Sequence, residues 1–146
     1  MNRVIRFRGY IECFDKTLER YVYGTLDKKK CDDNGLPEKG NNKYIIITDN
    51  GIKYHKVIQD SIGQYSGYID INEEEIYEGD ILRFGNYPFE EVRKAKVIYD
   101  NGFYIEILEG ECPVLENKRI EMKGDLEQYG MEVIGTEFEE VRNGEI

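Results

Sequence analysis

The chain has no tryptophan and few of the residues from which metal and redox sites are built. It holds one histidine, three cysteines and three prolines among 146 residues. Cys13, Cys31 and Cys112 are an odd number, stand far apart and include no C-x-x-C pair, the usual spacing of zinc and dithiol sites. We therefore expect reduced, mostly buried thiols, no metal site and no cofactor.

Long apolar runs are missing as well. The longest, residues 44–47, falls far short of the roughly 20 residues that cross a bilayer. The charged N-terminus, residues 1–8, has no apolar signal-peptide core. We therefore expect a protein of the cytoplasm with no membrane partner.

The charge is unbalanced, with 20 basic against 30 acidic side chains and a net charge of −10. Binding to nucleic acid releases counterions only where Lys and Arg are clustered, so this acidity disfavours nucleic acid as a partner. It favours a protein partner with a basic surface. The first 30 residues are locally basic, and Arg6 and Arg8 in them could meet the acidic C-terminal half of a neighbouring copy. We therefore also expect a homo-oligomer.

Alternation of apolar and polar residues dominates the chain, which predicts strands. Residues 4–11 alternate Ile5 and Phe7 with Arg6 and Arg8, and residues 21–23 can return as the second strand of an N-terminal hairpin over 1–26. Residues 27–43 are rich in Lys, Asp, Asn and Gly, which predicts a mobile surface loop.

Two Asn-Gly pairs, at residues 50–51 and 101–102, each stand between apolar runs, which is the strongest local signal of a hairpin. Gly135 is expected to mark a bend or bulge in the last strand. Helix is limited to a turn or two, within 72–77 or 123–129. Strands are expected at residues 44–48, 52–58, 80–84, 92–99, 103–108 and 131–138. Short, evenly spaced strands of this kind predict a mainly β sandwich or small barrel.

Five motifs occur in a recognisable order along the chain. They are I-R-F-R at 5–8, I-G-Q-Y-S-G at 62–67, E-I-Y-E-G-D-I at 75–81, V-I-Y-D-N-G-F-Y at 97–104 and E-V-I-G at 132–135. This series resembles the YopX family of small phage and prophage proteins. The chain departs from the family at Gly9-Tyr10, where an aromatic-Asp pair is usual, and at Thr136, where Asn is common.

The resemblance implies a mainly β fold with a small SH3-like barrel and an N-terminal β-hairpin extension. It also implies a gene on mobile elements of low-GC Gram-positive bacteria. We expect a single YopX-like domain over 1–146, with the hairpin at 1–26, the loop at 27–43 and the barrel core at 44–140. The resemblance implies no reaction.

The E-G-D segment is the first candidate site. Gly79 can adopt a positive φ in a tight turn, and Asp80 can accept a hydrogen bond from a backbone N–H where the next strand begins. The alternative is that Tyr77 and Asp80 form a small polar and aromatic binding spot. The sequence favours the turn.

The other candidates are weaker. Glu73, Glu74, Glu75 and Glu78, and also residues 27–35, lack the ligand spacing of a calcium loop and are expected to be solvated. His55 lies between two lysines with no nucleophile beside it, so we predict no catalytic residues and leave binding residues unknown. Tyrosines could stack on bases but more often pack their rings on a sheet. They are Tyr10, Tyr21, Tyr23, Tyr54, Tyr65, Tyr77, Tyr99 and Tyr104.

These observations favour a non-enzymatic phage or prophage accessory protein that binds a protein partner or self-associates. The alternative is a module that binds or sequesters a small molecule such as a nucleotide, through Lys and Arg of the N-terminal part. Direct nucleic-acid binding is the interpretation that the net charge of −10 disfavours most.

Overall fold

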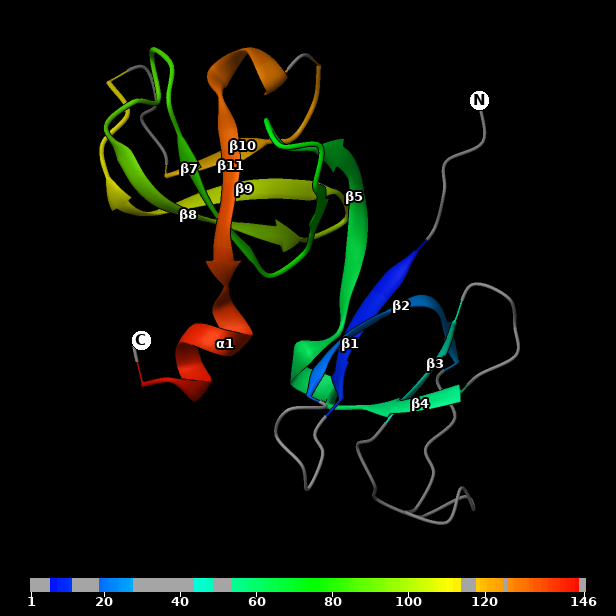
Figure 1. Ribbon diagram of the computed structural model, residues 1–146. Coiled ribbons are helices and arrows are strands. Elements are labelled where there is room, and N and C mark those ends of the chain that lie inside the picture. The colour runs from blue at the N-terminus through cyan, green and yellow to red at the C-terminus, as the bar shows by residue number, and fades with distance from the viewer. Residues whose placement is uncertain are drawn as a thin grey trace. The chain divides into compact units, whose positions relative to one another are not determined.

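The computed structural model describes residues 6–11, 19–27, 44–48, 54–113, 118–124 and 126–144 (Figure 1). The described residues have two antiparallel sheets and one short α-helix, so the prediction of a mainly β fold is confirmed. The chain divides into two compact units, residues 1–65 and 66–146. Each unit has its own hydrophobic core. No helix among these residues is long and apolar enough to span a membrane.

The first unit is a curled antiparallel sheet with the strand order β4-β3-β2-β1-β5. Its elements are β1 (Phe7–Ile11), β2 (Arg20–Asp27), β3 (Tyr44–Thr48), β4 (Tyr54–Val57), the 3₁₀ helix η2 (Gln59–Ser61) and the start of β5 (Gly63–Ile69). The N–H of Ile58, directly after β4, donates a hydrogen bond of 3.0 Å to the carbonyl of Tyr10 in β1. This bond brings the end of β4 back to β1. The expected pairing of β1 with β2 and of β3 with β4 is confirmed.

Close packing at Gly9 allows this curl. A Cβ at Gly9 would lie 2.7 Å from the side chain of Val57, so only glycine lets the two strands approach this closely. Val57 and Val22 are the buried centre of the unit's core, against which Phe7 and Ile11 pack. The expected inward position of Phe7 is therefore confirmed, and Ile5 lies outside the described residues.

The outward side of β1 differs from the prediction at Arg8. The alternation along β1 predicts a solvent-exposed side chain at Arg8, but Arg8 is only 5% exposed. Its guanidinium lies 4.6 Å from the ring centre of Tyr21, whose ring in turn meets Tyr10 edge-on at 5.1 Å. Arginine is weakly hydrated and stacks on aromatic faces, so period-two patterning alone misplaces it.

Two predictions for the first unit concern residues that the structure does not describe. The mobile loop predicted for residues 27–43 lies outside the described residues, apart from Asp27 at the end of β2. The Asn50-Gly51 turn also lies outside them, although the strands on either side of it pair as expected. The layout of one domain with hairpin, loop and core stays a prediction.

The second unit is built on a five-stranded antiparallel sheet with the order β10-β9-β8-β7-β11. It also holds the later part of β5, next to β6. Its elements are β6 (Glu75–Tyr77), β7 (Asp80–Phe84), β8 (Val92–Tyr99), β9 (Phe103–Gly110), β10 (Arg119–Glu121), the 3₁₀ helix η3 (Leu126–Tyr129), β11 (Met131–Thr136) and the helix α1 (Glu137–Arg142). Within the described part of the chain no pairing joins β10 to β11, so an SH3-like barrel is not established.

The local signals in this unit predict its turns well. Asn101 and Gly102 have φ of +55° and +152°, and Tyr99 pairs with Phe103 across them, so the second Asn-Gly hairpin is confirmed. The register of β11 against β7 shifts between Val133 and Gly135, which confirms the expected bulge.

The end of the chain was predicted incorrectly. The expected strand over 131–138 stops at Thr136, and the helix α1 follows it. The hydroxyl of Thr136 accepts a hydrogen bond of 3.1 Å from the N–H of Glu139, and this T-x-x-E spacing is a helix-capping signal. The expected turn of helix within 123–129 is present as η3, whereas residues 72–77 form a turn and β6.

Candidate functional site

The E-G-D motif forms the predicted turn. Gly79 has a φ of +92°, and its N–H donates a hydrogen bond of 2.8 Å to the carbonyl of Val97. The Oδ2 atom of Asp80 accepts a bond of 2.7 Å from the N–H of Tyr77. Tyr77 and Asp80 are both buried, so neither side chain faces a ligand at the surface. The motif fixes where β7 begins and thus which side chains of β7 reach the surface.

A second buried carboxylate, Asp70, was not singled out from the sequence. Its Oδ1 accepts hydrogen bonds from the N–H groups of Asn72 at 2.8 Å and Glu74 at 2.9 Å. Its Oδ2 accepts one of 3.0 Å from the N–H of Val133 in β11. The bond from Asn72 is that of an Asx turn, in which an Asp side chain accepts from the backbone N–H two residues later. Asp70 therefore ties the turn between β5 and β6 to the last strand.

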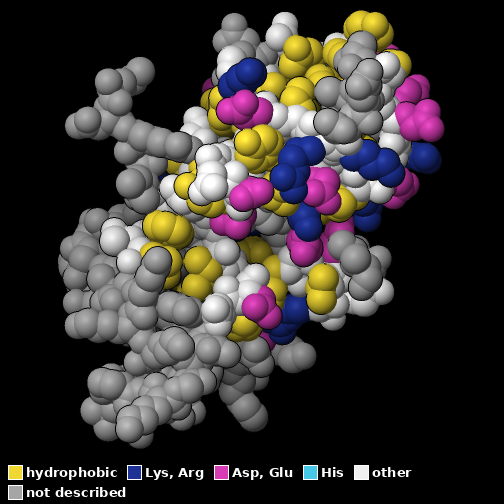
Figure 2. Space-filling model, turned by 180° about the vertical axis from the view of Figure 1, so that it is seen from behind, with side chains coloured by type: hydrophobic (Ala, Val, Ile, Leu, Met, Phe, Trp, Pro, Cys, Tyr) yellow, Lys and Arg dark blue, Asp and Glu magenta, His cyan; other side chains and the backbone are white. Residues whose placement is uncertain are grey.

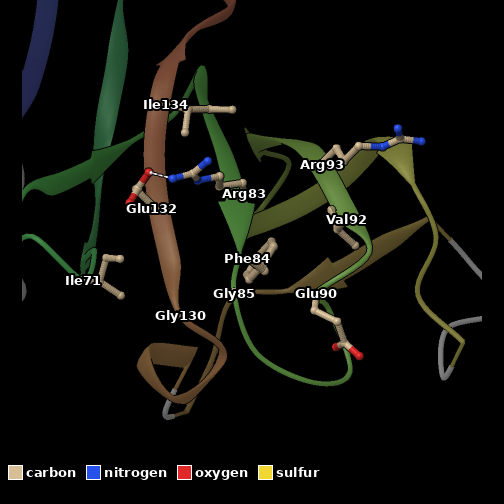
Figure 3. Close-up of a pocket in the computed structure, with 10 residues that line it drawn as sticks. All are labelled: Ile71, Arg83, Phe84, Gly85, Glu90, Val92, Arg93, Gly130, Glu132 and Ile134. Carbon is tan, nitrogen blue, oxygen red and sulfur yellow. Dashed lines mark ion pairs between the residues drawn. The ribbon is translucent and has the colours of Figure 1, made fainter.

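The sheet of the second unit carries an open hollow of about 580 Å³, which we call the β7–β11 groove (Figure 3). None of its residues was predicted as a site. They are Ile71, Arg83, Phe84, Gly85, Glu90, Val92, Arg93, Gly130, Glu132 and Ile134. They come from four separate segments of the chain, which is why no single sequence motif marks them.

The groove lies where β7 and β8 part. Ile81 of β7 pairs with Lys96 of β8, and Leu82 pairs with Ala95. After Leu82 the two strands are no longer paired. Figure 3 shows Phe84 on β7 and Val92 on β8 on either side of the gap that follows. The ladder between β8 and β9 is irregular at this point, with a register shift between Val92 and Lys94.

Gly110 of β9 lies against the irregular start of β8. A Cβ there would overlap the carbonyl oxygen of Glu91 and lie 2.9 Å from the backbone nitrogen of Arg93. Gly110 also has a φ of +103°, which disfavours any other residue. This close approach holds the first residues of β8 beside β9, on the side away from β7.

The floor and rim of the groove are apolar. Phe84 and Val92 are buried and form its floor. Ile71 and Ile134 also line it and are 55% and 42% exposed, although each is a large aliphatic side chain. Ile71 is held there because its N–H donates a hydrogen bond of 2.9 Å to the carbonyl of Met131.

The charged residues of the groove are only partly paired. Arg83 and Glu132 face each other across β7 and β11 and form an ion pair of 2.7 Å, shown dashed in Figure 3. Arg93 lies 3.6 Å from Glu109, with both side chains largely in water. Such exposed pairs contribute about 0–1 kcal/mol to stability.

Elsewhere on the second unit basic and acidic side chains are interspersed, as Figure 2 shows for one face. Lys96 of β8 pairs with Glu137 of α1 at 2.8 Å, and Lys94 pairs with Glu140 at 3.3 Å. These pairs hold α1 against β8. The lysines of β8 are therefore engaged by the chain itself.

The remaining predicted candidates do not meet at one place. His55 is half-buried on β4, Cys112 lies in the core of the second unit, and Glu73 and Glu74 are exposed. Cys13 and Cys31 lie outside the described residues. Of the tyrosines, Tyr23 and Tyr99 are exposed, Tyr10, Tyr65 and Tyr104 are half-buried, and the side chain of Tyr54 is not described. Among described residues, no three His, Cys, Asp or Glu side chains are grouped so that they could hold a metal ion.

A family model described as YopX protein matches residues 7–142. The chain belongs to the YopX family. The matched range includes strands of both compact units as well as Asp70, the E-G-D turn and the β7–β11 groove. No curated protein matches this YopX chain.

Proposed function

We propose that this YopX chain is a non-enzymatic phage or prophage accessory protein that acts in the cytoplasm of a bacterial host by binding a protein partner or by self-association. The observation that carries the proposal is the β7–β11 groove, where Ile71 and Ile134 are exposed beside a buried apolar floor. Large apolar side chains gathered at a hollow of the surface are typical of interaction sites.

The shape of the groove favours a protein over a small molecule. Small-molecule sites usually enclose most of their ligand and direct several polar groups toward it. This groove is open, and its best-placed cation, Arg83, is already paired with Glu132. In the N-terminal part, Arg8 is buried against Tyr21 and is not available to a phosphate. These features count against the alternative of nucleotide sequestration.

The buried carboxylates support a non-enzymatic role. Asp70 and Asp80 both accept hydrogen bonds from backbone N–H groups at turns, as buried structural carboxylates do. The three hydrogen bonds of Asp70 explain its presence without a substrate.

An SH3-like barrel for the second unit belongs to the same proposal. Its support is a five-stranded antiparallel order with a 3₁₀ turn, η3, directly before the last strand. A homo-oligomer also remains part of the proposal.

The test is affinity purification of the tagged full chain from the bacterium that carries its gene. Co-purified proteins and small molecules are both identified by mass spectrometry, and light scattering gives the mass of the chain at several salt concentrations. We expect one protein in stoichiometric amount, or a mass above the 17.2 kDa of a monomer. A monomer that carries only a nucleotide, with no protein bound, contradicts the proposal.

A further inference from the structure

At the β7–β11 groove the arginines are paired with carboxylates of the chain, and the charge left without an ion-pair partner among the described residues is negative. Arg83 is neutralised by Glu132, and Arg93 lies beside Glu109. Glu90, which lines the groove, is exposed and makes no ion pair with any described residue.

Two further glutamates, Glu91 and Glu111, lie close to Glu90 in the backbone. Glu91 follows Glu90 in sequence, and the N–H of Glu111 donates a hydrogen bond of 3.3 Å to the carbonyl of Glu91. Both side chains are exposed, and neither is ion-paired within the described part of the chain. The backbones of Glu90, Glu91 and Glu111 therefore lie close together at this end of the groove, and their side chains are exposed.

The net charge of the whole chain also favours a basic partner. A chain with a net charge of −10 attracts a partner with a basic surface. The groove is therefore suited to a cationic protein segment.

The apolar part of the groove is suited to an anchoring side chain. Phe84 and Val92 form a buried floor, and Ile71 and Ile134 stand at the rim. The loop between Gly85 and Glu90, both of which line the groove, also carries Tyr87, which is 71% exposed. Apolar anchors in a hollow, with aromatic residues near them, carry much of the energy of protein interfaces.

We propose that the β7–β11 groove binds a basic segment of a partner protein. An apolar side chain of that segment enters the groove beside Ile134, and flanking Lys or Arg side chains are attracted by the exposed carboxylates of Glu90, Glu91 and Glu111. This inference rests on the proposed protein-binding function and adds the site and the chemistry of the partner.

The test is selection of peptides about a dozen residues long from a random display library on the immobilised full chain. We expect the enriched peptides to combine Lys or Arg with one or two aliphatic or aromatic residues. Their binding to the wild-type chain is then measured by fluorescence anisotropy. Binding should weaken as salt is raised, because exposed charge pairs are screened.

Variants locate the binding site. Ile134→Glu should weaken binding about tenfold or more, which corresponds to the loss of one apolar anchor. Leu108→Glu is the matched control, because Leu108 on β9 and Ile134 on β11 are both 42% exposed and the two changes add the same charge. It should change binding less than about twofold. Glu90→Gln should weaken binding about threefold and reduce its salt dependence.

Circular dichroism establishes that each variant is folded, and Ile71→Glu replaces Ile134→Glu if the latter unfolds. Enrichment of acidic peptides, failure to enrich any peptide, or binding that is equally sensitive to Leu108→Glu overturns the inference. If the natural partner binds the Ile134→Glu variant as it binds wild type, the protein-binding function stands and the groove is not its site. If no partner or oligomer exists at all, the proposed function itself is wrong.

Discussion

The carboxylate of Asp70 accepts a hydrogen bond of 3.0 Å from the backbone N–H of Val133, 63 positions later in the chain. The same carboxylate closes the turn between β5 and β6 through the N–H groups of Asn72 and Glu74. One buried side chain thus satisfies three backbone donors and holds Ile71, the next residue, beside β11. The left side of the groove in Figure 3 depends on this contact.

We predict that Asp70→Ala destabilises the chain by roughly 2–4 kcal/mol, because three N–H groups lose their acceptor in a buried place. Urea denaturation measures the effect. Asp100→Ala is the control, since the side chain of Asp100 forms an exposed ion pair of 3.5 Å with Arg119, and its loss should cost less than about 1 kcal/mol. Equal stability of the two variants would contradict the structural role of Asp70.

The E-G-D turn gives a second prediction. Gly79→Val places a β-branched residue at a φ of +92° and should destabilise the chain by roughly 1–3 kcal/mol. Asp80→Asn should cost less, because the amide oxygen can still accept the hydrogen bond from Tyr77. Melting temperatures of both variants decide the order. A Gly79→Val variant that melts like wild type would rule out the strained turn.

Substitution of Gly110 tests whether β9 packs closely against the start of β8. Gly110→Ala combines the strain of a positive φ with overlap against Glu91 and Arg93. Gly67→Ala is the matched control, since Gly67 has a φ of +90° and no atom within 4 Å of an added Cβ. The control should cost roughly 1–2 kcal/mol from backbone strain alone. Gly110→Ala should cost roughly 1–3 kcal/mol more, from overpacking. Equal unfolding free energies in urea would show that the two strands are not pressed together.

Substitution of Gly9 tests the close packing of β1 against Val57 of β4 in the first unit. Gly9→Ala drives a methyl group to within 2.7 Å of Val57 and should destabilise this unit by roughly 1–3 kcal/mol. Gly135→Ala, also in a strand, meets nothing within 4 Å and should stay within about 0.5 kcal/mol of wild type. Hydrogen exchange of the amides in β1 and β4 reports the effect locally. Unchanged exchange in Gly9→Ala would contradict the packing.

Local signals predicted much of the fold because they act over a few residues. The Asn101-Gly102 turn and the Gly79 turn each follow from what one glycine allows, and the bulge in β11 lies at the expected position beside Gly135. The helix α1 also had a local signal, in the spacing of Thr136 and Glu139, which the apolar alternation of the preceding strand obscured.

The groove could not be predicted in this way. It depends on the point where β7 leaves β8, on the bulged start of β8 and on Asp70 reaching β11. The burial of Arg8 is similar, because it follows from stacking on Tyr21 of another strand and not from its own position in the pattern. Contacts between distant segments decide both features, and a single sequence does not display them.

The central claim is that a basic protein segment occupies the β7–β11 groove. The most direct measurement is the set of backbone amide shifts of the ¹⁵N-labelled full chain, recorded as the tightest-binding selected peptide is added. The claim predicts that the changes gather at Arg83, Gly85, Arg93 and Glu132, with the amide of Ile134 among the largest. Changes that gather instead on β9 and β10, or on the strands of the first unit, would contradict it.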